Sequence, residues 1–203
     1  MRDYKAESRA YFDKLASRYD QHYYGRHGRE QYRRVSEVVR DWKFTSVLDV
    51  GCGTGGLLAV LKRPRVKLAG IDLSPHMIDE AKMRLGTAAD MRVADSESLP
   101  WRAGSFDLVV STDSLHHWPH PLQAFSEMKR VLKKGGHVVV ADVTAPPLFK
   151  SLSNWIARFG KEGDVRVYSP AEVESMLREV GFFDVKREHV GPMAVVVSAA
   201  VRK

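Results

Sequence analysis

Short apolar runs alternate with helical patterns along most of the chain after residue 45. The runs are nearly continuous, as in strands buried on both faces, and they span residues 46–50, 66–71, 91–94, 106–110 and 137–143. Between them, residues 56–62, 75–85 and 121–132 have apolar positions at helical spacing, with Pro75 and Pro121 placed for a first helical turn. This alternation predicts a doubly wound α/β fold with a mostly parallel sheet.

The end of the chain follows a different pattern. A predicted helix over residues 170–180 stops at Gly181, and two strand-like runs follow at residues 183–190 and 193–201. Gly191 and Pro192 join these two runs, and so short a link permits only a hairpin. We therefore expect one antiparallel strand in an otherwise parallel sheet.

The first 42 residues carry no strand signal. Apolar residues fall near helical spacing in two groups: Tyr11, Phe12, Leu15 and Tyr19, and then Val35, Val38, Val39 and Trp42. The segment from Gly25 to Gly28 is predicted to be a turn between two helices. We expect one domain over residues 1–203, in which residues 1–42 form a helical lid and residues 45–203 form the α/β core.

Composition agrees with one compact domain. The chain has 203 residues, of which 32 are basic and 25 acidic, so its formal net charge is +7. The basic residues are spread along the chain, which favours a solvated surface over a nucleic-acid interface. Cys52 is the only cysteine, which excludes an intrachain disulfide and a thiolate zinc site. Neither a membrane span nor an apolar secretory segment is visible, so we expect a cytoplasmic protein.

A glycine-rich segment follows the first predicted strand. Residues 47–56 read VLDVGCGTGG, and glycines let the backbone turn sharply and let a ligand lie against main-chain N–H groups. The segment also satisfies G-x-G-x-x-G, and Asp72 follows Gly51 by 21 residues, as in a dinucleotide site. The loop alone therefore does not decide which nucleotide-containing ligand binds here.

Carboxylates at three successive strand ends help to decide between the possible ligands. Asp49, Asp72 and Asp95 are each separated by 23 residues, about one strand and one helix, so they should meet at the same edge of the sheet. Asp49 would repel the pyrophosphate of NAD, whereas an acidic edge attracts a cationic ligand. S-adenosylmethionine carries an ammonium and a sulfonium. Asp72 would then accept hydrogen bonds from the ribose hydroxyls, and Asp95 from the adenine amine.

The chain resembles the class I S-adenosylmethionine-dependent methyltransferases of the small-molecule type. The resemblance rests on residues 47–55, 70–78, 93–101 and 106–142, and residues 12–20 are similar to the lid of quinone-biosynthesis C-methyltransferases. It implies a Rossmann-like sheet of seven strands with the last strand antiparallel. It also implies cofactor contacts at Gly51, Gly53, Asp72, Leu73, Met77, Asp95 and Ser96, with Tyr19 as a lid contact. Asp49, Cys52 and Ser111 join this set through their places in the loop and at strand ends.

Two histidines follow the fourth predicted strand. A carbon or oxygen nucleophile must lose a proton during methylation, and His116 or His117 is a candidate base. The alternatives are that one histidine caps the loop and the other packs beneath the lid. A zinc site at His116, His117 and His120 has neither a thiolate nor matching spacing. Asp113 and Asp142 end neighbouring strands and could hold Mg²⁺, with surface carboxylates as the alternative, and no metal is predicted.

These patterns favour an enzyme that methylates a small molecule. An apolar helical pattern between residues 147 and 163 would roof the acceptor pocket in the resemblance, which favours an apolar or aromatic acceptor. The alternatives are an RNA or protein methyltransferase and a non-catalytic S-adenosylmethionine-binding regulator. The fourth strand is not followed by the proline-rich string of amino-methylating nucleic-acid enzymes, which argues against a nucleic-acid partner. A homodimer is kept as a hypothesis that the sequence does not decide.

Overall fold

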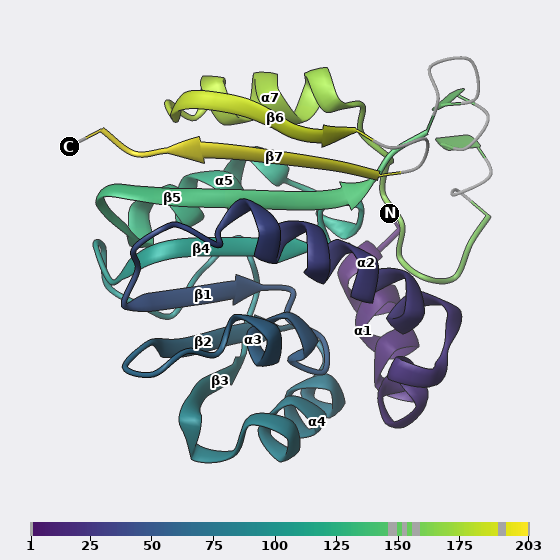
Figure 1. Cartoon of the computed structure of the whole chain (residues 1–203). Coiled ribbons are helices and arrows are strands. Elements are labelled where there is room, and N and C mark those ends of the chain that lie inside the picture. Colours follow the sequence, from purple (N-terminus) through teal and green to yellow (C-terminus); the bar gives the residue numbers. More distant parts are fainter. Residues whose placement is uncertain (1, 146–149, 152–153, 156–158, 191–193, 203) are drawn as a thin grey trace.

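A single seven-stranded sheet forms the centre of the molecule (Figure 1). The computed structural model describes residues 2–145, 150–151, 154–155, 159–190 and 194–202. The strands are β1 (Ser46–Val50), β2 (Lys67–Asp72), β3 (Ala89–Val93), β4 (Phe106–Thr112), β5 (Leu132–Val143), β6 (Phe183–Val190) and β7 (Ala194–Ala200). Their order is β3-β2-β1-β4-β5-β7-β6.

The predicted sheet is confirmed. Strands β1 to β5 pair in parallel, whereas β7 is antiparallel to both of its neighbours, β5 and β6. The chain reverses its direction of travel across the sheet between β1 and β4, and open α/β folds bind ligands at that point. The bounds differ from the expected ones mainly at β5, which begins at Leu132. The predicted link at residues 191–192 lies outside the described residues.

Helices cover both faces of the sheet. They are α1 (Tyr4–Leu15), α2 (Tyr23–Val38), α3 (Gly56–Leu61), α4 (Pro75–Leu85), α5 (Pro121–Val131) and α7 (Pro170–Glu179), with short 3₁₀ helices η1 (Ala16–Gln21), η2 (Gly86–Ala88) and η3 (Leu115–His117). One apolar core joins β-strand residues to α5 and α7, and the other joins them to α2, α3 and α4. No described helix is long and apolar enough to cross a membrane.

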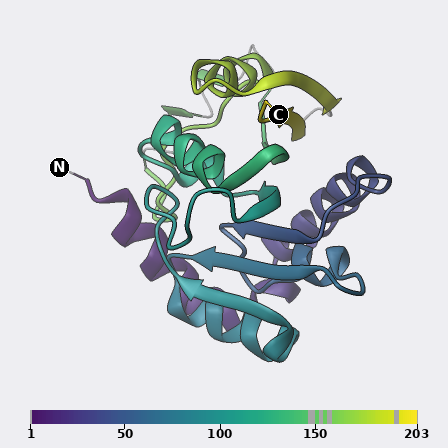
Figure 2. The ribbon, with the colours of Figure 1, turned by 90° about the vertical axis from the view of Figure 1, so that its left-hand side faces the viewer.

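The N-terminal helices lie over the edge of the sheet where β1 and β4 end. Both ribbon views place α1 beside the arrowheads of these strands (Figures 1 and 2). Asp3 begins α1 by accepting a hydrogen bond from the backbone N–H of Ala6. Eight of the 17 residues of the segment predicted to roof the acceptor pocket, residues 147–163, lie outside the described residues. Within it, Trp155 and Phe159 are exposed and contact each other edge to face.

The turn predicted at Gly25 to Gly28 is wrong, because α2 runs through it and the chain bends at η1 instead. Close packing explains these glycines. A Cβ atom on Gly25 would lie 2.2 Å from the carbonyl oxygen of Tyr19, so only glycine lets η1 rest against α2. A Cβ atom on Gly28 would meet only the side chain of Tyr32, at 3.1 Å.

We therefore expect Gly25→Ala to lower the free energy of unfolding by about 1–3 kcal/mol, because the backbone of η1 must move. Gly28→Ala is the matched control in the same helix. There alanine has the higher helix propensity and the neighbouring side chain can shift, so little loss is expected. Urea unfolding measures both variants, and equal effects would contradict this account of the bend.

Candidate active site

A cavity opens at the carboxyl ends of β1, β2 and β4, beneath α1 and η1. The space between its walls is about 780 Å³ when its open mouth is included. Its walls include ten of the residues predicted to form the site: Tyr19, Gly51, Cys52, Gly53, Asp72, Leu73, Met77, Asp95, Ser96 and His117. They also include Lys5, Ser8, Phe12, Tyr32, Ile71, Ala94, Thr112, Asp113, Ser114, Trp118 and Pro119.

The glycine-rich loop between β1 and α3 forms one wall. The backbone N–H groups of Gly51 and Cys52 donate to the carbonyl of Ile71 at 2.9 and 2.8 Å, which ties the loop to β2. Gly51 has a φ of 77°, and a Cβ atom there would lie 2.1 Å from Ser114 Oγ. The loop thus requires glycine at this position both for its backbone angle and for its contact with the segment after β4.

Asp72, the last residue of β2, faces this loop. Its two carboxylate oxygens accept hydrogen bonds from the backbone N–H groups of Gly53 and Ser74, each at 2.9 Å. Burial raises the pKa of Asp72 to about 6, although these two N–H groups act in the opposite direction. The carboxylate is therefore fixed in place in the cavity wall, and it keeps lone pairs for a ligand.

Asp95 and Ser96, which follow β3, line the same cavity and meet the N-terminal helix. Asp95 accepts from the backbone N–H of Glu97 at 2.9 Å, and its other oxygen lies 2.7 Å from Nζ of Lys5. Lys5 also pairs with Glu97 at 2.6 Å. Helix α1 thus places a cation at the carboxylate that was predicted to accept from the adenine amine.

Two residues predicted to contact the cofactor do not line the cavity. Asp49 lies beneath the loop, 1% exposed, and its carboxylate makes no hydrogen bond among the described residues. Burial and, to a lesser extent, the charge of Asp72 raise its pKa to about 8. Ser111 is fully buried and donates to the carbonyl of Val50 at 2.8 Å, so it joins β4 to β1.

The segment after β4 forms another wall of the cavity. Asp113 has a φ of 48°, and its buried carboxylate has no hydrogen-bond partner in the described part of the chain. Burial, followed by the charge of Asp142, raises its pKa to about 7. Trp118 donates from Nε1 to Ser114 Oγ at 3.0 Å, which holds its ring against this wall. An unpartnered carboxylate on the cavity wall suits a cationic ligand.

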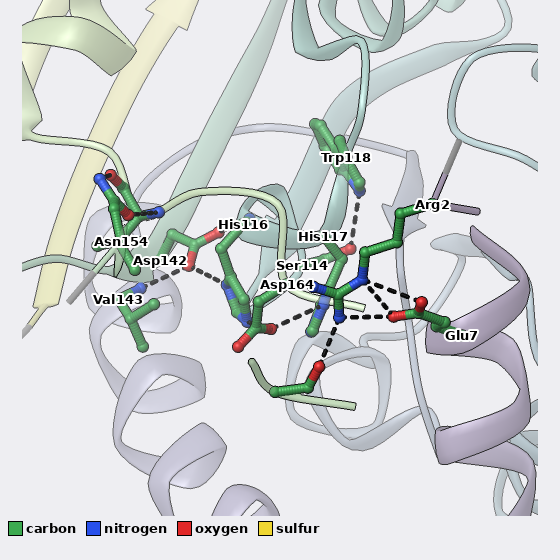
Figure 3. A network of polar contacts seen from close by, with 12 residues as sticks. Arg2, Glu7, Ser114, His116, His117, Trp118, Asp142, Val143, Asn154 and Asp164 are labelled. Atoms are coloured by element: carbon green, nitrogen blue, oxygen red, sulfur yellow. Dashed lines mark hydrogen bonds and ion pairs between the residues drawn. The ribbon is translucent and has the colours of Figure 1, made fainter. Parts of the chain in front are cut away.

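The two predicted catalytic histidines lie side by side, with ring centroids 4.1 Å apart, but only one of them lines the cavity (Figure 3). His117 lines the cavity, and its ring meets that of Phe12 edge to face with centroids 5.3 Å apart. His116 is not among the residues that line the cavity, and its Nδ1 lies 2.6 Å from Oδ1 of Asp142. Asp164 lies beside both rings. The structure therefore leaves only His117 in reach of a ligand in the cavity.

Burial lowers the pKa of His117 well below its usual value, and the neighbouring charge of His116 lowers it further. For His116, burial also acts to lower the pKa, but the charge and hydrogen bond of Asp142 outweigh it and raise the value to about 9. Imidazolium at His116 and neutral imidazole at His117 are therefore the favoured states at neutral pH.

Polar contacts hold η1 and the end of α1 onto the core. Asp20 accepts from Thr54 Oγ1 at 2.9 Å and forms an ion pair with Arg84 on α4. Asp13 accepts from the hydroxyl of Ser74 at 2.6 Å. These contacts bring Tyr19 to the cavity, where the lid hypothesis places it.

Sequence reasoning missed several residues around the cavity, and Lys5, Asp164 and Tyr32 show why. Lys5 and Asp164 reach the site from segments 90 and 47 residues away from their partners Asp95 and His117, and no local pattern marks such contacts. Tyr32, in contrast, could have been found from a local sequence pattern. It lies three residues before Val35 in the amphipathic pattern of α2, so it could have been placed on the face toward the sheet.

Comparison with known proteins agrees with this geometry. Residues 48–140 match the family described as methyltransferase domain. The chain is 30% identical over 190 residues to demethylmenaquinone methyltransferase of Staphylococcus aureus, covering 81% of this chain and 79% of the relative. It is 34% identical over 155 residues to a chloroplastic 2-methyl-6-phytyl-1,4-hydroquinone methyltransferase of rice (Oryza sativa subsp. japonica), covering 72% of this chain. The match spans only 43% of the rice protein.

Solved structures share the fold. Phosphoethanolamine N-methyltransferase 2 of Haemonchus contortus, bound to S-adenosylhomocysteine, superposes with a TM-score of 0.81 at 17% identity, covering 100% of this chain and 61% of that one. A SAM-dependent methyltransferase of Thermotoga maritima gives 0.74 at 21% identity, with coverage of 94% and 98%. The sequence match to the Staphylococcus enzyme is long enough to decide the family. The chain belongs to the S-adenosylmethionine-dependent methyltransferases.

Proposed function

We propose that this protein transfers a methyl group from S-adenosylmethionine to a small aromatic acceptor of the phenol or hydroquinone class. The observation that carries the proposal is the cavity wall, in which Asp72 is fixed against the glycine-rich loop and Asp95 stands at the next strand end. The rice and Staphylococcus relatives are named for hydroquinone and menaquinone methylation, which supports a quinone-type acceptor.

The cavity walls support a specific orientation of the cofactor. Asp72 would accept from the ribose hydroxyls, and Asp95 with Ser96 would bind the adenine amine. Leu73 and Met77 line the cavity beside these two strand ends and would pack on the adenine ring. The methionine part would then lie along Gly51 and Gly53, near Asp113 on the cavity wall, whose ionised carboxylate would attract its ammonium and sulfonium groups. Asp49, buried beneath the loop, would add to this attraction only if ligand binding ionised it.

Alignment is the main requirement of methyl transfer, because the sulfonium loses its charge as the new bond forms. The side chains that would align an acceptor are aromatic: Phe12, Tyr19 and Trp118 line the cavity around His117. They favour a flat apolar ring over a polymeric RNA or a protein side chain. A base role for His117 stays a prediction, and His116 lacks direct access to the cavity.

Transfer of labelled methyl tests this function and its alternatives. The protein is incubated with methyl-labelled S-adenosylmethionine and, in separate reactions, a panel of hydroquinones and phenols, bulk RNA, and bulk protein. We expect label in the small-molecule fraction. Label confined to RNA or protein would support the second hypothesis, and tight cofactor binding without any transfer would support a regulator. Either result would contradict the proposal.

The lid gives a second prediction. If α1 and η1 close over the cofactor, S-adenosylhomocysteine should slow tryptic cleavage at Lys14 and Arg18. Lys5→Met should speed cleavage without ligand by up to about fivefold, because a partly exposed ion pair contributes up to about 1 kcal/mol. Arg9→Met is the control, since Arg9 is exposed on the same helix. Cleavage that neither the ligand nor Lys5→Met changes would contradict a mobile lid.

Two predictions from the sequence concern the cellular location and the oligomeric state of the protein. A cytoplasmic location and a homodimer both stay hypotheses. Cell fractionation tests the first, and sedimentation equilibrium of the purified protein tests the second.

A further inference from the structure

Two histidines and an aspartate converge beside the cavity (Figure 3). His117 Nδ1 lies 3.1 Å from Asp164 Oδ1, and His116 Nε2 lies 3.9 Å from the same oxygen. One ligand atom from each of the three side chains falls within 4.8 Å of the other two. Atoms that bind a cation at about 2.0–2.2 Å stand at comparable distances from each other. The cluster therefore has the dimensions of a metal site after small side-chain shifts.

Two of these atoms have no hydrogen bond. His117 Nδ1 and Asp164 Oδ1 are shielded from solvent and lack a hydrogen-bond partner among the residues that the structure describes. The His117 side chain is only 10% exposed, and the alignment with Asp164 is not that of a hydrogen bond. Buried polar atoms without partners are costly, and a cation between them would remove that cost.

Asp142 supplies the second feature of a metal site. Its carboxylate lies 2.6 Å from His116 Nδ1 and also accepts from the backbone N–H of His116 at 3.2 Å. Nδ1 therefore carries the proton that it donates to Asp142, and Nε2 is the nitrogen that faces the cluster. In the metal-free protein the His116 imidazolium also carries a proton on Nε2, and a bound ion would release that proton to solvent and take its place. Histidines that bind metals usually donate their other ring N–H to such a carboxylate, which fixes the tautomer and the orientation of the ring.

We propose that His116, His117 and Asp164 bind one divalent transition-metal ion of the Zn²⁺ type, and that Asp142 orients His116 for this role. Two imidazole nitrogens and one carboxylate suit such an ion, whereas Mg²⁺ and Ca²⁺ prefer oxygen ligands. Three protein ligands leave at least one coordination position for water or an acceptor.

The site is built by a long-range contact. The carbonyl of His116 accepts from the backbone N–H groups of Val165 and Arg166 at 2.8 and 3.2 Å, which holds Asp164 against the histidines. His120, the third histidine of the loop, is exposed at the start of α5 and takes no part. A bound ion would occupy the nitrogen atoms that a base needs, so this site and a base role for His117 exclude each other.

Metal titration tests the site without an acceptor. Chelator-treated protein is titrated with Zn²⁺ by calorimetry, and with Co²⁺, whose visible absorption reports on the ligands. We expect one ion per chain, loss of saturable binding in Asp164→Asn and His117→Asn, and about tenfold to hundredfold weaker binding in Asp142→Asn. His120→Asn is the matched control and should bind as the wild type does.

Circular dichroism and S-adenosylhomocysteine binding check that each variant is folded. Absence of saturable Zn²⁺ binding to the wild-type protein would overturn the proposal, and so would equal binding by Asp164→Asn and wild type. If a variant fails to fold, the Co²⁺ spectrum of the wild type decides, since a spectrum like that of the free aquo ion refutes coordination by histidine. Methyl transfer can succeed or fail independently of these results.

Discussion

Replacement of Asp72 by alanine is expected to weaken S-adenosylhomocysteine binding by about tenfold to hundredfold. Hydrogen bonds to a charged acceptor contribute about 1.5–3 kcal/mol, and Asp72 is proposed to accept from the ribose hydroxyls. The same carboxylate also accepts from the backbone N–H groups of Gly53 and Ser74, so its removal loosens the loop as well as the ligand contact.

Calorimetric titration with S-adenosylhomocysteine measures this effect. Asp79→Ala serves as the control, because Asp79 is an exposed carboxylate on α4 and should leave affinity unchanged. Affinity of Asp72→Ala within twofold of the wild type would show that the ribose does not bind at β2, even if the cofactor binds elsewhere.

A second large effect concerns the stability of the ligand-free protein as pH rises. Burial raises the pKa of Asp49 to about 8, so the folded state holds this proton more tightly than the unfolded state, where the value is about 3.9. The stability that this group contributes is therefore present at low pH and is lost as pH rises through the pKa of Asp49 in the folded state. Between the unfolded and the folded pKa of Asp49, the free energy of unfolding falls by about 1.4 kcal/mol per pH unit. The loss between pH 6 and pH 8 is therefore roughly 2 kcal/mol.

Asp49→Asn cannot ionise, so its free energy of unfolding should fall less than that of the wild type between pH 6 and pH 8. The groups whose charges act together with Asp49 are Asp72, Cys52 and Tyr32, and all three are retained in the variant. Urea unfolding at several pH values measures the difference, with Asp79→Asn as the surface control. Parallel pH curves for Asp49→Asn and the wild type would mean that Asp49 is not the titrating group.

The sheet was predictable because its signal is local. Each strand is a short apolar run, and a nearly continuous apolar run is the pattern of a parallel strand buried on both faces. The two glycines in α2 were misread because a glycine that marks a turn and one that permits close packing look the same in sequence. Only the distance from Gly25 to the carbonyl of Tyr19 separates the two cases.

The candidate site was predictable where it depends on strand ends. Asp72 and Asp95 line the cavity because the sheet topology places the ends of successive strands next to each other. Asp49 precedes the last residue of β1, so its side chain points beneath the loop, and Ser111 forms a strand-to-strand contact. Asp164 reaches the histidines from a distant segment, and spacing carries no information about such a contact.

A crystal structure of the protein with S-adenosylhomocysteine tests the central claim most directly. We expect the ribose hydroxyls to bind the carboxylate of Asp72 and the adenine amine to bind Asp95, with Lys5 displaced toward Glu97. We expect the sulfur to face the aromatic wall beside His117. A ligand bound outside this cavity, or one that enters it with the adenine at the His117 wall, would contradict the account.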